Sequence, residues 1–319
     1  MKWLDMRKYD DYPKSLRKNK YKFILLMLTL SILSFLVFYV GINFQSIMLA
    51  FKVHVKENPM DIGHYEWSTR QFKNVWTSLT DTTSANHLRT AFKNTLFLFV
   101  MGNLVTFPMG CFISYYLWKK MYGYSLYRVL FYIPQIISSV VTVIIFQNFV
   151  DPSGVLSTIK IRLTGEPFPP FLQSYKTAIW FIWIYNTWIG FAGAYLLLTA
   201  ALSRIPAEII ESAQLDGVTP IVEFLKICVP LIWPTLQIIL LQKIAGILSA
   251  DGPILLLTNG EYGTYTLGFW SYMQVYGQGS GENTMCFSAA VGLCMTAVVA
   301  PIALLSKYLM GKVNKDVDF

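Results

Sequence analysis

The sequence predicts an all-α membrane protein with six transmembrane helices. Of the 319 residues, 54% are hydrophobic and only 14% are charged, so the chain holds more apolar surface than a soluble domain of this size can bury. The chain also contains six apolar stretches that reach the length of about 20 residues that a helix needs to cross a bilayer. Both observations indicate that lipid is the solvent of this chain.

The six predicted spans follow one another along the chain, and all are too long for strands. They cover residues 23–51, 94–118, 126–150, 178–202, 227–250 and 285–306. The first stretch lies behind a basic segment, as the apolar part of a signal peptide does. It is long and has no small-residue cleavage site, so we expect it to remain as a membrane anchor.

The distribution of Lys and Arg predicts the orientation of these spans, because positive charge resists transfer across the membrane. With a cytoplasmic N-terminus, sixteen of the 26 basic residues fall on the cytoplasmic side and nine fall in the outer loops. Both termini are therefore predicted to be cytoplasmic. This orientation divides the chain into a cytoplasmic segment 1–22, the first span 23–51, an outer loop 52–93, a core 94–308 and a cytoplasmic tail 309–319.

The net charge of +8 does not indicate binding to nucleic acid. The basic residues gather in the first 22 positions, where they suit anionic lipid beside a membrane anchor. The four cysteines lie singly in or beside apolar spans, and the three histidines all lie in the loop 52–93. Neither set has the spacing of metal ligands, so we predict no metal site and no disulfide framework.

A polar segment, residues 203–226, interrupts the apolar pattern on the predicted cytoplasmic side and is called the acidic loop below. Its carboxylates are Glu208, Glu211, Asp216 and Glu223. Pro206 suits the first turn of a helix, and Gly217 suits the end of that helix because glycine readily adopts the left-handed conformation. Thr219-Pro220 then suits the start of a second helix. We predict two short amphipathic helices whose acidic face fits a protein socket better than an anionic lipid surface.

The acidic loop carries the motif by which the chain resembles a known family. Glu211-Ser212-Ala213, then Gly217, then Ile227-Cys228-Val229-Pro230 resembles the E-A-A–x3–G–x9–I-x-L-P signature of permease subunits in binding-protein-dependent ABC importers. Ser for the first Ala and Val for the Leu are the two departures. The segments IPAEIIESAQLDG, YRVLFYIP, NTWIG and LLTNG are similar to the carbohydrate-importing branch, in particular to the larger permease of maltose importers.

This resemblance implies a fold, partners and roles for the acidic loop. The implied fold is the type I ABC importer permease fold, in the cell membrane of a prokaryote. The loop would be the coupling helix pair that docks on a partner ATPase, through Glu208, Glu211, Ala213, Asp216 and Gly217. The implied partners are a second permease subunit in a heterodimer, two ATPase subunits and an extracytoplasmic solute-binding lipoprotein. ATP and Mg²⁺ would be bound by the ATPase, because this chain has no Gly-rich phosphate loop followed by Lys-Ser/Thr and is expected not to be an enzyme.

The resemblance also implies a substrate path along the fourth and fifth spans. Sugar rings stack on aromatic side chains and need polar partners, and the fourth span offers Trp183 and Asn186. Aromatic residues are equally typical of membrane cores and interfaces, so these positions could be structural instead. Compared with the maltose importers, Asn186, Ile189 and Gly190 match, and Gly193 replaces a contacting Tyr. The sugar-contacting positions of the fifth span correspond here to Lys243, Gly246, Ile247 and Ala250, so a different ligand is implied.

Lys243 is the basic residue in the central part of a predicted span, where a cation typically faces a cavity or a partner. It could pair with Asp251 or with a carboxylate of a partner permease. It could instead bind the carboxylate of a uronic acid, which would make the substrate an acidic oligosaccharide. Two further hypotheses are a permease for a peptide or an osmolyte, and a membrane-embedded transferase. The transferase is disfavoured because the inner loops show no paired Asp motif and no His–Asp pairing.

Overall fold

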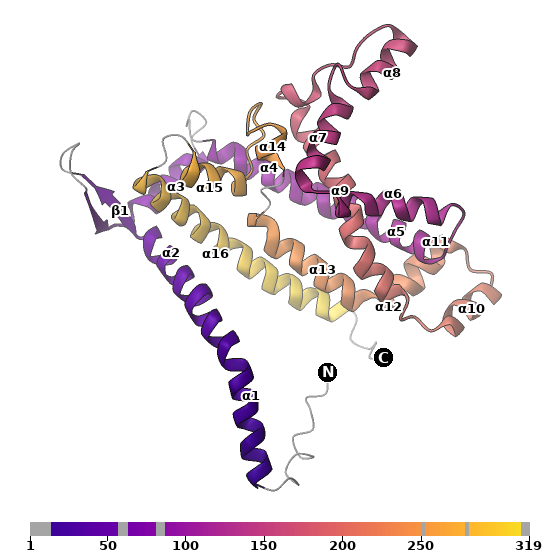
Figure 1. The fold of residues 1–319 in the computed structure, drawn as a ribbon, viewed down its shortest axis with the longest axis horizontal. Helices are drawn as coiled ribbons and strands as arrows, with labels where there is room; N and C mark the ends of the chain where they lie inside the picture. The colour runs from indigo at the N-terminus through magenta and orange to yellow at the C-terminus, as the bar shows by residue number, and fades with distance from the viewer. Residues whose placement is uncertain (1–13, 57–62, 81–86, 250–252, 278–280, 314–319) are drawn as a thin grey trace.

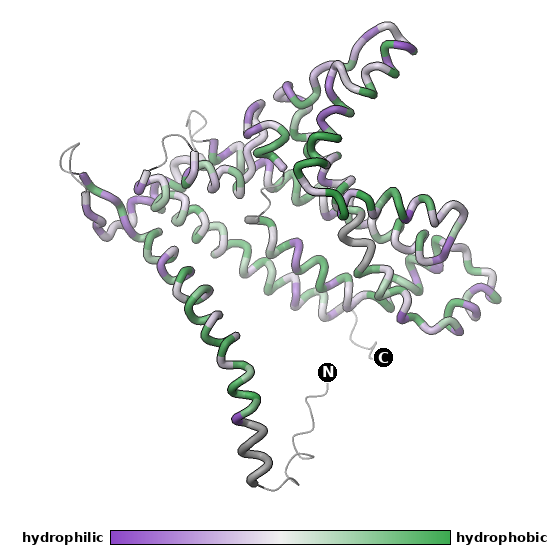
Figure 2. The backbone as a smooth tube through the Cα atoms, viewed as in Figure 1, coloured by the Kyte–Doolittle hydropathy of each residue, from purple (hydrophilic) through white to green (hydrophobic). Residues whose placement is uncertain are grey.

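The computed structural model describes residues 14–56, 63–80, 87–249, 253–277 and 281–313, and these residues form a helical protein. The described part of the chain begins with a long, mostly apolar helix made of α1 (Lys14–Ser34), the π-helical turn η2 (Phe35–Gly41) and α2 (Ile42–Ala50). This helix leans away from the rest of the molecule, and Figure 2 shows that most of its length is apolar. Its exposed leucines, phenylalanines and valines are the surface that a lipid environment would cover.

The predicted outer loop 52–93 is structured and includes a feature that the all-α prediction lacked. Strands β1 (Lys52–Val55) and β2 (His64–Trp67) form an antiparallel hairpin, and helix α3 (Arg70–Thr80) follows it. The hairpin is attached to the start of α16 (Glu282–Val313), because His54 Nε2 lies 2.7 Å from a Glu282 carboxylate oxygen. Burial raises the pKa of the Tyr65 hydroxyl, and the hydrogen bond to Glu282 adds to the rise.

The second predicted span is a helix of 31 residues with a π-helical turn near its middle. It consists of α4 (Leu88–Met101), η3 (Gly102–Thr106) and α5 (Phe107–Trp118). Pro108 stands at the beginning of α5 and has no N–H to donate to the carbonyl one turn earlier. A wider turn before the proline lets the helix continue, which explains the π-helical turn at this position.

The third predicted span, 126–150, is wrong as one helix, because the structure breaks it into α6 (Tyr124–Ile136) and α7 (Ser139–Val150). Ile137 has an extended backbone with ψ 143°, and Ser138 also leaves the helical region with ψ 140°. Figure 1 shows α7 turning away from the direction of α6. The chain continues through α8 (Val155–Thr164) and a short 3-10 turn, η4 (Phe171–Gln173), and the predicted fourth span is the 25-residue helix α9 (Ala178–Leu202).

The acidic loop and the predicted fifth span form a bent series of short helices. These are α10 (Ala207–Leu215), α11 (Pro220–Glu223), η5 (Phe224–Cys228), α12 (Val229–Leu231), α13 (Trp233–Ala245) and η6 (Gly246–Ser249). The helix turns by 77° between the segment ending at Leu231 and the segment beginning at Trp233, so the predicted span 227–250 is not one straight helix. Pro230 follows η5 at the same distance at which Pro108 follows η3.

Helices α14 (Ile254–Leu257), α15 (Leu267–Tyr276) and α16 (Glu282–Val313) complete the described chain. By length and composition, four described helices are able to cross a membrane, and a fifth span is obtained if the bent pair counts as one. The predicted number of six therefore stays a prediction. Figure 1 places the β-hairpin and α10 at opposite ends of the molecule.

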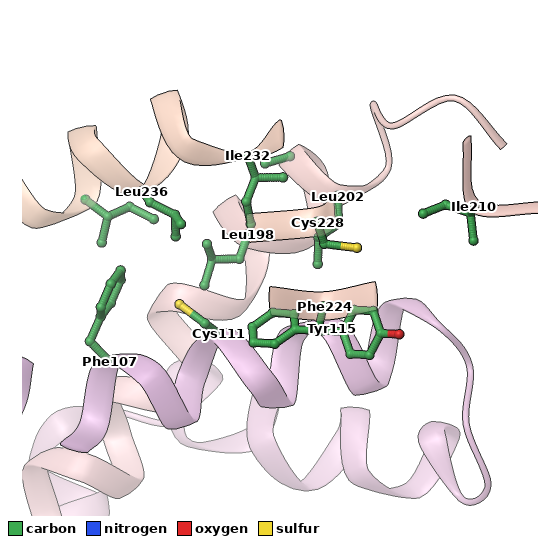
Figure 3. Close-up of a cluster of buried hydrophobic side chains, with 12 residues drawn as sticks. Phe107, Cys111, Tyr115, Leu198, Leu202, Ile210, Phe224, Cys228, Ile232 and Leu236 are labelled. Atoms are coloured by element: carbon green, nitrogen blue, oxygen red, sulfur yellow. The ribbon is translucent and has the colours of Figure 1, made fainter. Parts of the chain in front are cut away.

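Three clusters of buried apolar side chains hold these helices together. One cluster joins α5, α9 and α13 to the acidic loop and includes Tyr115, Leu202, Ile210 and Phe224 (Figure 3). A second joins α2, α3, α4 and α15 to α16, and a third joins α7, α9, α14 and α15. The acidic loop is therefore anchored in the core of the helical bundle and is not a loose connection.

Candidate functional site

The corner of the acidic loop has the geometry that its sequence predicts. Helix α10 ends at Leu215, and Gly217 adopts the left-handed conformation with φ +73°. The N–H of Gly217 donates to the Gln214 carbonyl at 3.0 Å, and the N–H of Val218 donates to the Ala213 carbonyl at 3.1 Å. These two bonds form a Schellman motif, which satisfies carbonyls at the end of a helix and sends the chain in a new direction.

The exposed face of this corner is acidic, as predicted. Glu208, Glu211 and Asp216 are exposed, while Ala213 and Ile210 are buried. Figure 3 shows Ile210 near the apolar cluster that includes Leu202 and Cys228. Apolar contacts thus fix the inner side of α10, and its carboxylates remain available to a partner.

One carboxylate of the loop does not belong to this acidic face. Glu223 is buried, although it is among the carboxylates of the predicted acidic face. Its carboxylate accepts hydrogen bonds from Lys119 at the end of α5 and from the Tyr115 hydroxyl. The second helix, predicted as amphipathic, buries only part of its apolar residues, because Phe224 and Cys228 are buried while Ile221 and Leu225 are exposed.

The predicted substrate path lies on α9, α13 and η6. Trp183, Asn186, Ile189, Gly190 and Gly193 all belong to α9. Lys243 belongs to the last turn of α13, and Gly246 and Ile247 lie in η6. Ala250 and Asp251 lie outside the described residues, so the suggested pairing of Lys243 with Asp251 is not tested.

The ammonium group of Lys243 is directed toward the π-helical turn η3. Its Nζ lies 3.5 Å from the Gly102 carbonyl oxygen and 5.3 Å from the centre of the Phe107 ring. Among the described residues, no carboxylate forms an ion pair with Lys243. A half-buried cation whose described partners are a carbonyl and an aromatic face can still accept an anionic ligand.

Helix α9 approaches the same π-helical turn from another side. The hydroxyl groups of Thr106 and Thr187 lie 2.8 Å apart, and a Cβ atom at Gly190 would lie 3.7 Å from the Thr106 methyl group. Gly190 and Lys243 are thus both beside η3, whereas within the described part of the chain no hydrogen bond or ring contact joins Lys243 to Trp183 or Asn186. The turn η3 links the two halves of the predicted path.

Two buried polar atoms near this region lack a hydrogen-bond partner among the described residues. They are the indole nitrogen of Trp183 and the side-chain oxygen of Asn103, which lies within η3. Buried polar groups are usually paired, so such atoms mark places where a ligand or water can bind. The prediction from sequence missed Gly102, Asn103 and Thr106, although Pro108 in the middle of an apolar span was a signal of an irregular turn there.

A separate cavity of about 420 Å³ lies between the ends of α7, η4 and α14, and its lining includes Gln147, Asp151, Phe171 and Tyr262. None of the residues predicted for the substrate path lines this cavity. This cavity is lined mainly by the end of α7, by the segment around η4 and by the segment from α14 toward α15. The predicted path and this cavity are therefore different features of the molecule.

Comparison with known proteins places these features in a family. The sequence profile of the binding-protein-dependent transport system inner membrane component matches residues 106–318, which contain both the acidic loop and α13. The chain is 27% identical over 222 residues to the maltose/maltodextrin transport system permease protein MalF of Escherichia coli strain K12, covering 66% of this chain and 42% of MalF. It is also 27% identical over 271 residues to the alpha-glucoside transport system permease protein AglF of Rhizobium meliloti, covering 82% of this chain and 74% of AglF.

The fold is shared with a solved structure over almost the whole chain. A crystal structure described as a bacterial ABC transporter involved in the import of the acidic polysaccharide alginate superimposes with a TM-score of 0.74 and 23% identity, over 94% of this chain and 99% of the other. This similarity confirms the predicted fold class, the permease fold of type I ABC importers. The chain spans only about two fifths of the length of MalF. Because the family profile matches well over half of its residues, the chain belongs to the family of binding-protein-dependent transport system inner membrane components.

Proposed function

We propose that this chain is the transmembrane permease subunit of an ATP-driven importer and forms the translocation path for a sugar or oligosaccharide. The acidic loop is the observation that carries the proposal. Its Schellman corner at Gly217 is exposed, and exposed carboxylates flank it. Helix α10, which leads into this corner, lies at one end of the molecule (Figure 1). A rigid corner with an apolar inner side and an acidic outer side is a suitable docking element for a cytoplasmic ATPase.

The chemical energy would come from partner subunits. The sequence contains no Gly-rich phosphate loop followed by Lys-Ser/Thr, so two partner ATPases would bind ATP and Mg²⁺. A second permease subunit would complete the path, and an extracytoplasmic binding lipoprotein would deliver the substrate. The acidic loop and both termini would then face the cytoplasm of a prokaryotic cell, which agrees with the excess of Lys and Arg on that side.

The substrate in this proposal is an acidic oligosaccharide. Lys243 supports an anionic ligand, because its ammonium group has no carboxylate partner among the described residues and lies beside the Gly102 carbonyl. A uronic acid carboxylate would supply the missing negative charge. MalF and AglF are permeases for maltose/maltodextrin and alpha-glucosides, and the structural neighbour is described as importing alginate. These names favour a carbohydrate over the peptide or osmolyte of the alternative hypothesis.

Reconstitution of the full complex tests the function. The permease would be purified with its partner permease, its ATPase and its binding protein, and placed in proteoliposomes with ATP. Uptake of a labelled oligouronate, a neutral maltooligosaccharide and a peptide would be measured in parallel. ATP-dependent uptake of the oligouronate supports the whole proposal, and uptake of the neutral sugar alone removes the acidic substrate. Uptake of the peptide alone removes the carbohydrate.

A further inference from the structure

The junction between α5 and the acidic loop contains a buried ion pair that the proposed function does not use. Lys119 follows directly after α5, and Glu223 is the last residue of α11. Lys119 Nζ lies 2.5 Å from Oε1 and 2.8 Å from Oε2 of Glu223, although the two residues are 104 positions apart in the sequence. The Tyr115 hydroxyl donates a third hydrogen bond to Oε1 at 3.0 Å.

The surroundings of this pair are apolar and closely packed. The side chain of Glu223 is 2% exposed and that of Lys119 is 21% exposed. The Tyr115 ring lies 5.0 Å from the Phe224 ring, and Phe112 also contacts Phe224 edge-on. Figure 3 shows Tyr115 and Phe224 side by side between α5 and the acidic loop. Because the carboxylate is almost fully buried and accepts three hydrogen bonds, from Lys119 and Tyr115, the pair resists separation.

The pair connects one end of α5 to the loop, while the other end of α5 reaches the predicted substrate path. Lys119 and Phe107 are twelve positions apart, about 18 Å along a helix at 1.5 Å per residue. At that far end Phe107 and the neighbouring turn η3 contact Lys243. Movement of α11 would therefore be passed along α5 to the place where Lys243 lies.

In the described part of the chain, the outer part of the loop has no comparable attachment. Helix α10 contacts the bundle through apolar residues such as Ile210 and Ala213, and these contacts allow small sliding movements. Among the residues that the structure describes, Lys119–Glu223 is the ion pair that joins the acidic loop to a membrane helix. The hydrogen-bonded ion pair of Glu223 is therefore the interaction that fixes the geometry between the loop and the bundle most strongly.

We propose that the Lys119–Glu223 pair, with Tyr115, is the joint through which movement of the acidic loop is transmitted to α5 and the substrate path. This proposal rests on the proposed importer function and adds positioning residues to it. Buried ion pairs add little net stability compared with apolar packing, so their presence at a mechanical junction is better explained by the fixed geometry that they impose.

The test measures how many substrate molecules are imported for each ATP hydrolysed in the reconstituted complex. Glu223→Gln keeps the shape and the hydrogen-bonding oxygen but removes the charge. The variant is expected to retain the ATPase subunit and to lose transport per ATP by roughly tenfold, the size of a typical coupling between sites. Lys120→Met is the matched control, because Lys120 is the next residue and is exposed, and it is expected to behave as wild type.

The double variant Lys119→Glu with Glu223→Lys restores an ion pair with exchanged charges. It tests whether the pair transmits movement or is needed only for folding. Recovery of transport per ATP in this double variant supports the joint. Normal transport per ATP in Glu223→Gln, or an exchanged pair that assembles without recovery, overturns it. If neither variant assembles, the pair serves folding alone and the proposal is wrong. Absence of ATP-driven uptake by the wild-type complex would instead count against the proposed function.

Discussion

Lys119 and Lys243 lie near opposite ends of α5, and their ammonium groups have very different surroundings. Lys119 is held by both oxygens of a buried carboxylate at 2.5 and 2.8 Å. Lys243 has the Gly102 carbonyl at 3.5 Å and the face of Phe107, with no carboxylate among the described residues. The first cation is neutralised within its own chain, whereas no carboxylate in the described part of the chain neutralises the second. This difference indicates an architectural role for Lys119, and it supports the proposal that Lys243 binds a ligand.

The largest effect is expected from breaking the neutralised pair. Lys119→Met leaves the Glu223 carboxylate buried without a cation, which typically costs about 3–5 kcal/mol of the free energy of unfolding. Chemical denaturation of the purified chain in detergent would measure the loss. The double variant Lys119→Met with Glu223→Leu removes both charges and is expected to regain most of the stability. A single variant as stable as wild type would contradict the assignment of Lys119.

Lys243 should show the opposite pattern, with a loss of uptake and little loss of stability. Lys243→Gln removes the proposed charged partner of the substrate, and a hydrogen bond to a charged group contributes about 1.5–3 kcal/mol. Uptake of an oligouronate at low concentration should fall about ten- to a hundredfold, while assembly and thermal stability stay near those of wild type. Lys243→Arg keeps the charge and serves as control. A complex that falls apart on Lys243→Gln would show that a partner permease neutralises this lysine.

Gly217 sharpens the comparison of the two lysines, because it carries no charge and its expected role depends on its backbone conformation alone. Gly217 has φ +73° and open space around the position of a Cβ atom, so a side chain there meets conformational strain and no collision. Gly217→Val should cost about 1–2 kcal/mol and reduce the ATPase stimulation by the loaded binding protein. Asn tolerates the left-handed conformation, so Gly217→Asn should retain most of the stimulation. Equal stimulation in the Val variant would remove the role of the corner.

The smallest effect is expected at an exposed carboxylate. Glu211 has no ion pair within the described part of the chain, so its removal leaves no buried charge behind. Glu211→Ala should weaken binding of the ATPase subunit by up to about 1 kcal/mol, the usual value of an exposed ion pair, without changing substrate affinity. Co-purification and titration of the ATPase would measure this, with Gln214→Ala on the same helix as control. An unchanged ATPase affinity would argue against a docking role for Glu211.

Much of the candidate site could be predicted because its signals are local. The corner of the acidic loop depends on Gly217 and on hydrogen bonds between residues at most five positions apart, so a short segment contains all of the required information. The break of α6 and α7 at residues 137–138 was missed, because the apolar composition continues through it. The β-hairpin of the outer loop was also missed, since its docking depends on Glu282 and Asn283 more than two hundred positions later.

The sequence by itself determined that the chain spans a membrane, where most helices lie, and that an acidic corner interrupts them. These properties follow from apolar length and from turn chemistry, both of which act over a few turns of chain. Only the tertiary structure decided which charges are neutralised. Glu223 looked like its exposed neighbours until folding placed Lys119 and Tyr115 beside it, and Lys243 looked like a candidate for pairing until folding placed it beside Gly102 and Phe107. Whether a charge is buried and paired depends on groups brought together from distant parts of the chain, and no local pattern encodes that.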